Sequence, residues 1–241
     1  MDTRHCEPLV RTLPPSSSRR GFLVSLGSLV LAAAPLALAN DAAARKRKRK
    51  RRSARPRRRV RTLRFANTTP IAVPGSGDEG PANPYPSTIK VSGFANGVIV
   101  DVKVLLSGFS HSAPPDVDVL LAARHLPGLD AFIMSDVAAT PPGASGPDVN
   151  LVLDDASPIL LPINGPLESG TYQPTNVEDG GSDHDVFPAP APAPSGNTSL
   201  SVFKGQNPNG VWELWVLDDT DDDVGSFAGG WGLEITAEVD A

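Results

Sequence analysis

The most informative segment of this 241-residue chain reads Asn209-Gly210-Val211-Trp212-Glu213-Leu214-Trp215-Val216-Leu217-Asp218. Trp212, Leu214 and Val216 recur at every second position, which is the period of a β-strand with one buried face. Asn209-Gly210 is a tight-turn pair directly before this strand. The segment therefore predicts a strand that starts at a turn and contributes a large indole side chain to the core.

The same alternation recurs elsewhere between residues 65 and 241. Four valines and a leucine share one face of a predicted strand, with Asp101 and Lys103 opposite: Val98, Val100, Val102, Val104 and Leu106. Residues 116–121 and 231–236 alternate in the same way. Turn-forming pairs such as Asn96-Gly97 and Gly229-Gly230 separate the strands, and we find no amphipathic helical pattern. This organisation predicts an all-β sandwich or jelly roll.

Residues 137–197 are richer in loop-forming residues. Their most regular part is Pro188-Ala189-Pro190-Ala191-Pro192-Ala193-Pro194. Alternating prolines favour an extended, polyproline-type conformation. We expect a rigid strap on the protein surface, and a ligand for a proline-binding domain is the alternative.

The first 44 residues have the anatomy of a signal peptide. Ser18-Arg19-Arg20-Gly21-Phe22-Leu23 places two arginines before an apolar run that ends at Leu38, and small residues follow it. This arrangement resembles a twin-arginine signal. Residues 1–44 therefore predict export, to a secreted or surface-associated destination. An uncleaved membrane anchor is the alternative, because the run approaches the length of a membrane span.

Charge divides the rest of the chain into a basic arm and an acidic domain. Residues 45–64 hold 14 Lys and Arg and no acidic residue, which predicts a disordered arm. Residues 65–241 hold 24 Asp and Glu against four Lys and Arg. Such a domain repels nucleic acid and anionic membranes, so only the arm is suited to anionic wall polymer or lipid headgroups. The single cysteine, Cys6, lies in the signal, so we expect no disulfide in the domain.

The C-terminal sequence resembles the P domain, or homo B domain, of subtilisin-like proprotein convertases. The resemblance rests on residues 209–218, on the turn Asp223-Val224-Gly225, and on Trp231-Gly232-Leu233-Glu234-Ile235. Residues 115–121 are similar to an earlier core strand of that family, and the similarity covers nearly all of 65–241, as in bacterial stand-alone versions. It implies a jelly-roll β-sandwich of the galactose-binding-like kind, with about eight strands.

This resemblance, with the strand period, assigns places to individual side chains. Trp212 and Trp231 are expected to pack inside the sandwich. Gly225 is expected to take a positive φ. Trp215 lies on the opposite face from Trp212, which makes it the better candidate for an exposed contact.

In convertases the P domain accompanies a catalytic domain and is thought to stabilise it. Gly225-Ser226-Phe227-Ala228-Gly229 is not a nucleophile elbow, because its serine comes one place early. His111, His125 and His184 have no serine partner in the sequence and are interpreted as surface residues. We therefore expect an accessory module without catalytic residues that binds or stabilises a protease or an extracellular polymer. The alternatives are an adhesive surface protein held by its basic arm, and a role in proteolysis by domain association alone.

Acidic residues cluster where the predicted strands end. Asp116 and Asp118 alternate along one strand, and residues 218–223 contain five carboxylates, while Asp136, Asp154 and Asp155 lie at other expected loop edges. Calcium accepts six to eight oxygen ligands in loose geometry. The sequence predicts a structural Ca²⁺ site, and no other cofactor, from a set of five candidates: Asp116, Asp118, Asp218, Asp219 and Asp223. A solubilising acidic loop without metal is the alternative.

Overall fold

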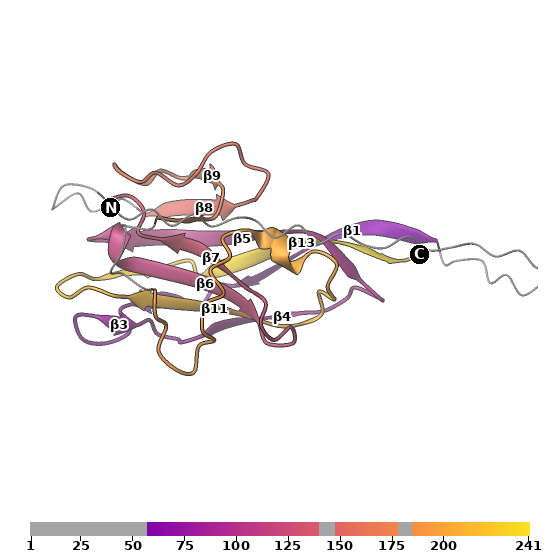
Figure 1. Ribbon diagram of the computed structural model, residues 1–241, viewed down its shortest axis with the longest axis horizontal. Coiled ribbons are helices and arrows are strands. Elements are labelled where there is room, and N and C mark those ends of the chain that lie inside the picture. Colours follow the sequence, from indigo (N-terminus) through magenta and orange to yellow (C-terminus); the bar gives the residue numbers. More distant parts are fainter. Residues whose placement is uncertain (1–56, 140–147, 178–184) are drawn as a thin grey trace, which may run out of the picture. The chain divides into compact units, whose positions relative to one another are not determined.

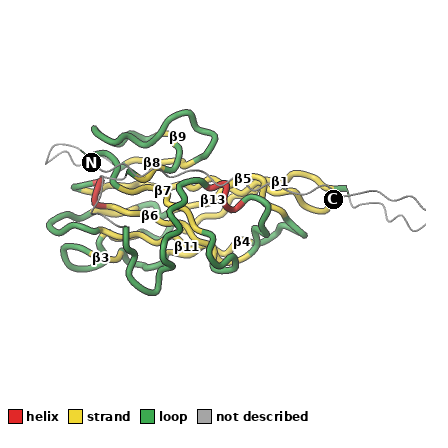
Figure 2. Tube along the Cα trace, in the orientation of Figure 1, coloured by secondary structure: helices red, strands yellow, loops and turns green. Residues whose placement is uncertain are grey.

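The computed structural model describes residues 57–139, 148–177 and 185–241 (Figure 1). These residues form 13 strands in two sheets, and helix is confined to two short 3₁₀ turns, η1 (Pro114–Asp116) and η2 (Leu200–Phe203) (Figure 2). The all-β sandwich predicted from the sequence is confirmed, with more strands than the expected eight or so. Within the described ranges no helix is long and apolar enough to cross a bilayer. The predicted signal, 1–44, and most of the predicted arm lie outside the described residues.

The larger sheet has seven strands. Its main path runs in the order β1 (Arg58–Asn67), β13 (Trp231–Asp240), β5 (Val98–His111), β12 (Gly225–Phe227) and β2 (Ile71–Val73). Two further strands, β8 (Val149–Leu153) and β9 (Gly170–Tyr172), extend it from β5. All pairs are antiparallel except β8 with β9.

The smaller sheet has six strands. Its path runs in the order β10 (Thr175–Asn176), β7 (Asp130–Ser135), β6 (Val117–Ala123), β11 (Gly210–Asp218) and β3 (Gly80–Pro81), and β4 (Ser87–Val91) also pairs with β11. Figure 1 shows β6, β7 and β11 as one layer beside β5 and β8 of the other sheet. The C-terminal motif thus supplies β11 to one sheet and β13 to the other.

The two tryptophans of the motif lie in the core between the sheets, as expected. Trp212 and Trp231 are both fully buried. Each indole N–H is satisfied: Trp212 Nε1 donates to the Pro208 carbonyl at 3.0 Å, and Trp231 Nε1 donates to Ser87 Oγ at 2.9 Å. Because neither polar atom is left unpaired, the indoles contribute their apolar area without a desolvation cost.

The outer face of the smaller sheet carries a second apolar cluster: Leu120, Ala122, Phe132, Phe187, Trp215 and Leu217. Trp215 is only 3% exposed, so the expected exposed contact is wrong. Tyr85 packs edge-on against the Trp215 ring, with centroids 4.8 Å apart, and its hydroxyl donates to the Pro188 carbonyl at 2.9 Å. The proline-rich strap, 188–194, therefore begins on top of this cluster and helps to bury a face that strand period alone assigns to solvent.

The predicted arm ends earlier than the sequence suggested. Residues 58–64 belong to β1, which pairs with β13 over ten positions. Acidic residues on β13 face the arginines: Arg64 pairs with Glu234 and Arg58 with Glu238. The basic composition of 58–64 thus matches an acidic neighbouring strand, and disorder was the wrong prediction for these residues.

Two local predictions also need correction. The register between β13 and β5 shifts at Thr236/Ala237, so that Ile99 turns inward and Val100 is 42% exposed. Gly225 does not have a positive φ. A Cβ at Gly225 would lie 2.1 Å from the Ser110 carbonyl, so the close approach of β12 to β5 requires glycine there.

Candidate functional site

Most of the acidic side chains singled out in the sequence lie where β6 begins, β7 ends and β11 ends. In this region the structure separates them into two groups. Asp116 and Asp218 belong to a network around His111, with Asp223 nearby. Asp118 belongs to a different group on the outer face of the smaller sheet. Asp154 and Asp155 lie elsewhere, held by Lys103 and by the turn at Ser199, respectively.

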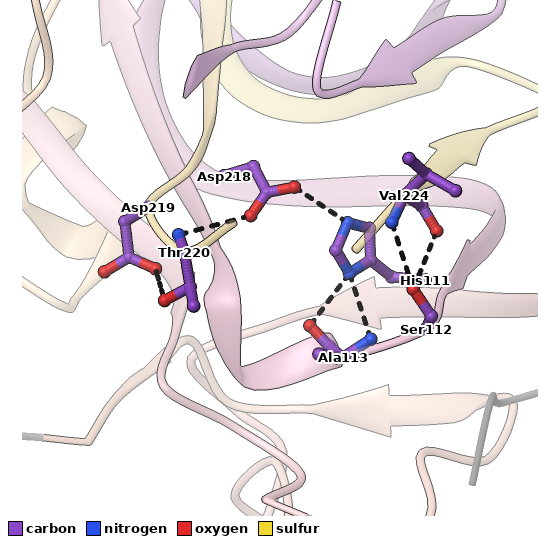
Figure 3. A network of polar contacts seen from close by, with 7 residues as sticks. All are labelled: His111, Ser112, Ala113, Asp218, Asp219, Thr220 and Val224. Atoms are coloured by element: carbon purple, nitrogen blue, oxygen red, sulfur yellow. Dashed lines mark hydrogen bonds and ion pairs between the residues drawn. The ribbon is translucent and has the colours of Figure 1, made fainter. Parts of the chain in front are cut away.

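His111 is the centre of the first network (Figure 3). It is the last residue of β5 and only 1% exposed, so the interpretation as a surface residue is wrong. Its Nε2 lies 3.2 Å from Asp218 Oδ2 and its Nδ1 lies 2.8 Å from the Ala113 carbonyl. Ser112 and Val224 exchange hydrogen bonds beside it, which ties β5 to the turn after β11. The Ala113 N–H also lies 3.3 Å from Nδ1, so both ring nitrogens have hydrogen-bond partners inside the network.

Charges in this network partly compensate each other. Burial, followed by the neighbouring Asp218 and Asp223 carboxylates, raises the pKa of Asp116 to about 6, and His111 acts in the opposite direction. Burial also raises the pKa of Asp218, and His111 again lowers it. His111 therefore already occupies one side of the Asp218 carboxylate as a hydrogen-bond partner, which weakens the case for a divalent cation between Asp116 and Asp218.

The second group consists of Asp118, Asp136 and Asp185. One carboxylate oxygen from each lies within 4.8 Å of the others. Asp118 is on β6, Asp136 directly follows β7, and Asp185 precedes the proline-rich strap. Ser135 Oγ lies within hydrogen-bond distance of two of these carboxylates, 3.0 Å from Asp136 Oδ2 and 2.9 Å from Asp185 Oδ1. Asn176 Nδ2 donates to Asp185 Oδ2 at 2.8 Å.

One oxygen atom of this group and one of the adjoining Asn176 have no hydrogen-bond partner among the described residues. They are Asp118 Oδ2 and Asn176 Oδ1, and both are buried. Burial, followed by the charge of Asp185, raises the pKa of Asp118 to about 9, although a hydrogen bond with Ser135 lowers it. Buried oxygens without donors, in a group of like charges, have the chemistry of a hard-cation site.

The sequence prediction covered this group only in part. Asp118 was a predicted ligand and Asp136 was noted as a loop-edge carboxylate. Asp185 was missed, because only the folding of the 185–188 segment over the smaller sheet brings it to β6 and β7. A pocket of about 430 Å³ borders this group. Its acidic lining consists of Asp118, Asp185, Asp219, Glu79 and Asp218.

A groove of about 480 Å³ lies farther along the same outer face. Trp215 and Glu213 from β11 line it, together with the turn between β6 and β7 and two prolines of the strap, Pro190 and Pro192. Arg124 forms an ion pair with Glu213 at this groove. The groove therefore combines an apolar lining with the Arg124–Glu213 ion pair and the Asp130 carboxylate, which accepts hydrogen bonds from Ser195.

No protein-family model matches this chain, and no curated protein matches it either. A solved structure, the crystal structure of the serine protease of Aeromonas sobria, is similar with a TM-score of 0.32 and 12% sequence identity. The alignment covers 79% of this chain and 29% of the protease chain. At this TM-score and identity the likeness is distant.

Proposed function

We propose that the domain is an exported, non-catalytic module of the P-domain type that binds and stabilises a protein partner, namely a subtilisin-like protease. Support comes from the sequence motif and from the roles of its residues. Trp212 and Trp231 are core side chains on β11 and β13, so packing explains these residues of the motif. A partner therefore has to bind other, surface residues of the domain. The twin-arginine-like signal supports export.

The groove over β11 is the observation that carries the proposal. Its volume of about 480 Å³ lies within the range of ligand-binding clefts. One wall is the turn between β6 and β7. The other is the strap, which is not extended throughout as expected: residues 189–190 form a turn, and the Ala191 N–H donates to the Pro188 carbonyl at 3.2 Å. A cleft between two such walls is suited to an extended polypeptide segment.

The chemistry of the groove favours a polypeptide over the other polymers. Sugar rings and nucleobases stack on exposed aromatic faces, but the Trp215 ring is almost fully buried and Tyr85 packs against it. The domain carries 24 acidic side chains against four basic ones after residue 64, so it attracts a cationic surface and repels polyanions. We therefore infer that the partner is a protein with a basic contact surface.

The buried histidine supports a non-catalytic role. A general base needs a free lone pair within reach of a substrate proton. His111 is buried, and its ring nitrogens contact Asp218 and Ala113. Purified protein should not hydrolyse peptide substrates above the blank rate, and hydrolysis abolished by a serine-directed inhibitor would contradict the proposal.

Site-specific photo-crosslinking in the producing cells tests the partner. A photoreactive side chain replaces Pro127 in the groove, and the matched control replaces Val60, which is exposed on β1 of the other sheet. We expect a discrete protein adduct from position 127, identified by mass spectrometry as a subtilisin-like protease, and none from position 60. Adducts with polysaccharide, with a protein of another class, or equally from both positions would refute the proposal.

A further inference from the structure

We propose that Asp118, Asp136, Asp185 and Asn176 form a Ca²⁺ site, and that the bound ion fixes the strap that walls the groove over β11. The metal site stands on its own geometry, whereas the effect on the groove rests on the proposed function. This ligand set differs from the set predicted by the sequence, since it retains only Asp118.

The spacing of the carboxylates fits one calcium ion. Ca²⁺–oxygen distances are about 2.3–2.6 Å, so two ligands on opposite sides of the ion lie about 5 Å apart. The oxygens of Asp118, Asp136 and Asp185 lie within 4.8 Å of one another, so one ion can contact all three. Asn176 lies next to them, because β10 pairs with β7 at Asn176 and Ser135 and its amide touches Asp185.

Asp118 is the independent indication that a ligand belongs here. The residue is 99% buried, being 1% exposed, and its Oδ2 has no hydrogen-bond partner among the described residues. A buried carboxylate oxygen without a donor is energetically unfavourable, and proteins retain such groups where a counter-ion compensates them. The carbonyl oxygen of Asn176 is also buried and unpaired, and it supplies a neutral oxygen ligand.

The donor set favours Ca²⁺ over other divalent cations. All four groups offer oxygen, which excludes the soft-ligand sites typical of zinc. They come from four separate segments rather than one rigid loop, which suits the flexible coordination of calcium better than the strict octahedron of magnesium. The pocket of about 430 Å³ that borders Asp118 and Asp185 provides room for the water ligands that complete the coordination shell.

The strap connects this site to the groove. Asp185 is followed by Phe187, whose ring lies 6.1 Å from that of Phe132, and by Pro188, whose carbonyl accepts the Tyr85 hydroxyl. Pro190 and Pro192 then line the groove. An ion that holds Asp185 against β6 and β7 therefore fixes the first residue of this segment. Without the ion, Asp185 is held by hydrogen bonds from Ser135 and Asn176, and repulsion from the neighbouring Asp136 carboxylate opposes that attachment.

Calorimetric titration of chelator-treated full-length protein with CaCl₂ tests the site. We expect one ion per chain. In Asp185→Asn and in Asp136→Asn the Kd for Ca²⁺ should rise by at least ~10–100-fold, which is the loss of metal affinity that removal of an outer-shell partner already causes. Asn tolerates the left-handed backbone of Asp136, whose φ is 54°, so that variant is expected to fold. Asp221→Asn, an exposed carboxylate of the nearby turn, is the matched control and should leave the Kd unchanged.

Two results would overturn the metal site. One is the lack of any saturable Ca²⁺ binding by the untagged wild-type protein. The other is a Kd that is unchanged in Asp185→Asn but raised in Asp223→Asn, since this places the ion at the turn after β11. Neither result depends on a partner, so the metal site can fail or stand separately from the proposed function.

Hydrogen exchange tests the coupling to the strap without a partner. The Ala191 amide donates to the Pro188 carbonyl at 3.2 Å, so it reports on the strap. We expect its exchange to slow at least about tenfold when Ca²⁺ is added to wild type, and to be unchanged in Asp185→Asn. Equal rates with and without Ca²⁺ in wild type would refute the coupling.

Discussion

In calcium-free buffer we expect Asp118→Asn to stabilise the protein. Burial and the neighbouring Asp185 carboxylate raise the pKa of Asp118 to about 9, whereas an aspartate in an unfolded chain titrates near 3.9. Above pH 4 the unfolded chain releases this proton and the folded protein retains it. Folding stability therefore falls as the pH rises from about 4 toward 9. Asn is neutral in both states, so the substitution removes this cost.

The magnitude follows from the two pKa values. One pKa unit corresponds to about 1.36 kcal/mol, so the cost reaches about 4 kcal/mol at pH 7 and about 1.5 kcal/mol at pH 5. Relaxation around Asp118 reduces these values, and we expect a gain of about 2–4 kcal/mol at pH 7. Asp118→Asn also lets an amide donate to the carboxylates of Asp136 and Asp185, which acts in the same direction.

Urea unfolding at pH 5 and pH 7, with chelator or with Ca²⁺, measures the effect. With chelator the variant should be more stable than wild type, by more at pH 7 than at pH 5. With Ca²⁺ at 100 times the Kd, wild type should gain about 2.7 kcal/mol and the variant should gain little. Asp221→Asn controls for the loss of one negative charge. A variant that is less stable than wild type at pH 7 in chelator would refute the reasoning.

Three further predictions concern the core, the histidine network and β1. Trp212→Ala should lower the free energy of unfolding by about 3–5 kcal/mol in urea, because it empties a fully buried site; a loss below about 1 kcal/mol would contradict that burial. Asp116→Asn should become more stable than wild type as the pH rises from about 4 to 6, because the folded pKa of Asp116 is raised to about 6. The gain in the free energy of unfolding should reach about 1 kcal/mol after allowance for partial exposure. A stability difference between variant and wild type that does not change with pH would count against it. Deletion of residues 1–56 should leave the melting temperature almost unchanged. Deletion of residues 1–64 should lower it sharply, because this deletion removes most of the ten-residue pairing of β1 with β13. Equal melting temperatures of the two deletion variants would show that β1 is dispensable.

Local pattern was enough to predict the strands of the C-terminal motif. Trp212 and Trp231 are buried where their strand period places them, and turns follow the Gly and Pro signals. Local pattern failed where one face is covered by distant sequence. Trp215 has the period of an outward residue, but Tyr85 and Phe187 lie 130 and 28 positions away in sequence and still cover it. The register shift near Val100 is a property of two paired strands, so one strand's period cannot reveal it.

The candidate metal site shows the same limit. The sequence drew attention to residues 218–223 because they are close together in the chain. In the structure, the Asp218 carboxylate contacts His111, and the group that includes the unpaired buried oxygen of Asp118 combines Asp118, Asp136 and Asp185 instead. Carboxylates from three segments meet only through the pairing of β6 with β7 and the course of the strap. Spacing along the chain therefore indicated the right end of the sandwich and gave only one member of this group.

Anomalous diffraction from crystals grown with CaCl₂ is the most direct measurement on the proposed metal centre. We predict one strong calcium peak about 2.3–2.6 Å from carboxylate oxygens of Asp118, Asp136 and Asp185. A peak at the 218–223 turn, or no peak at a saturating calcium concentration, would contradict the account.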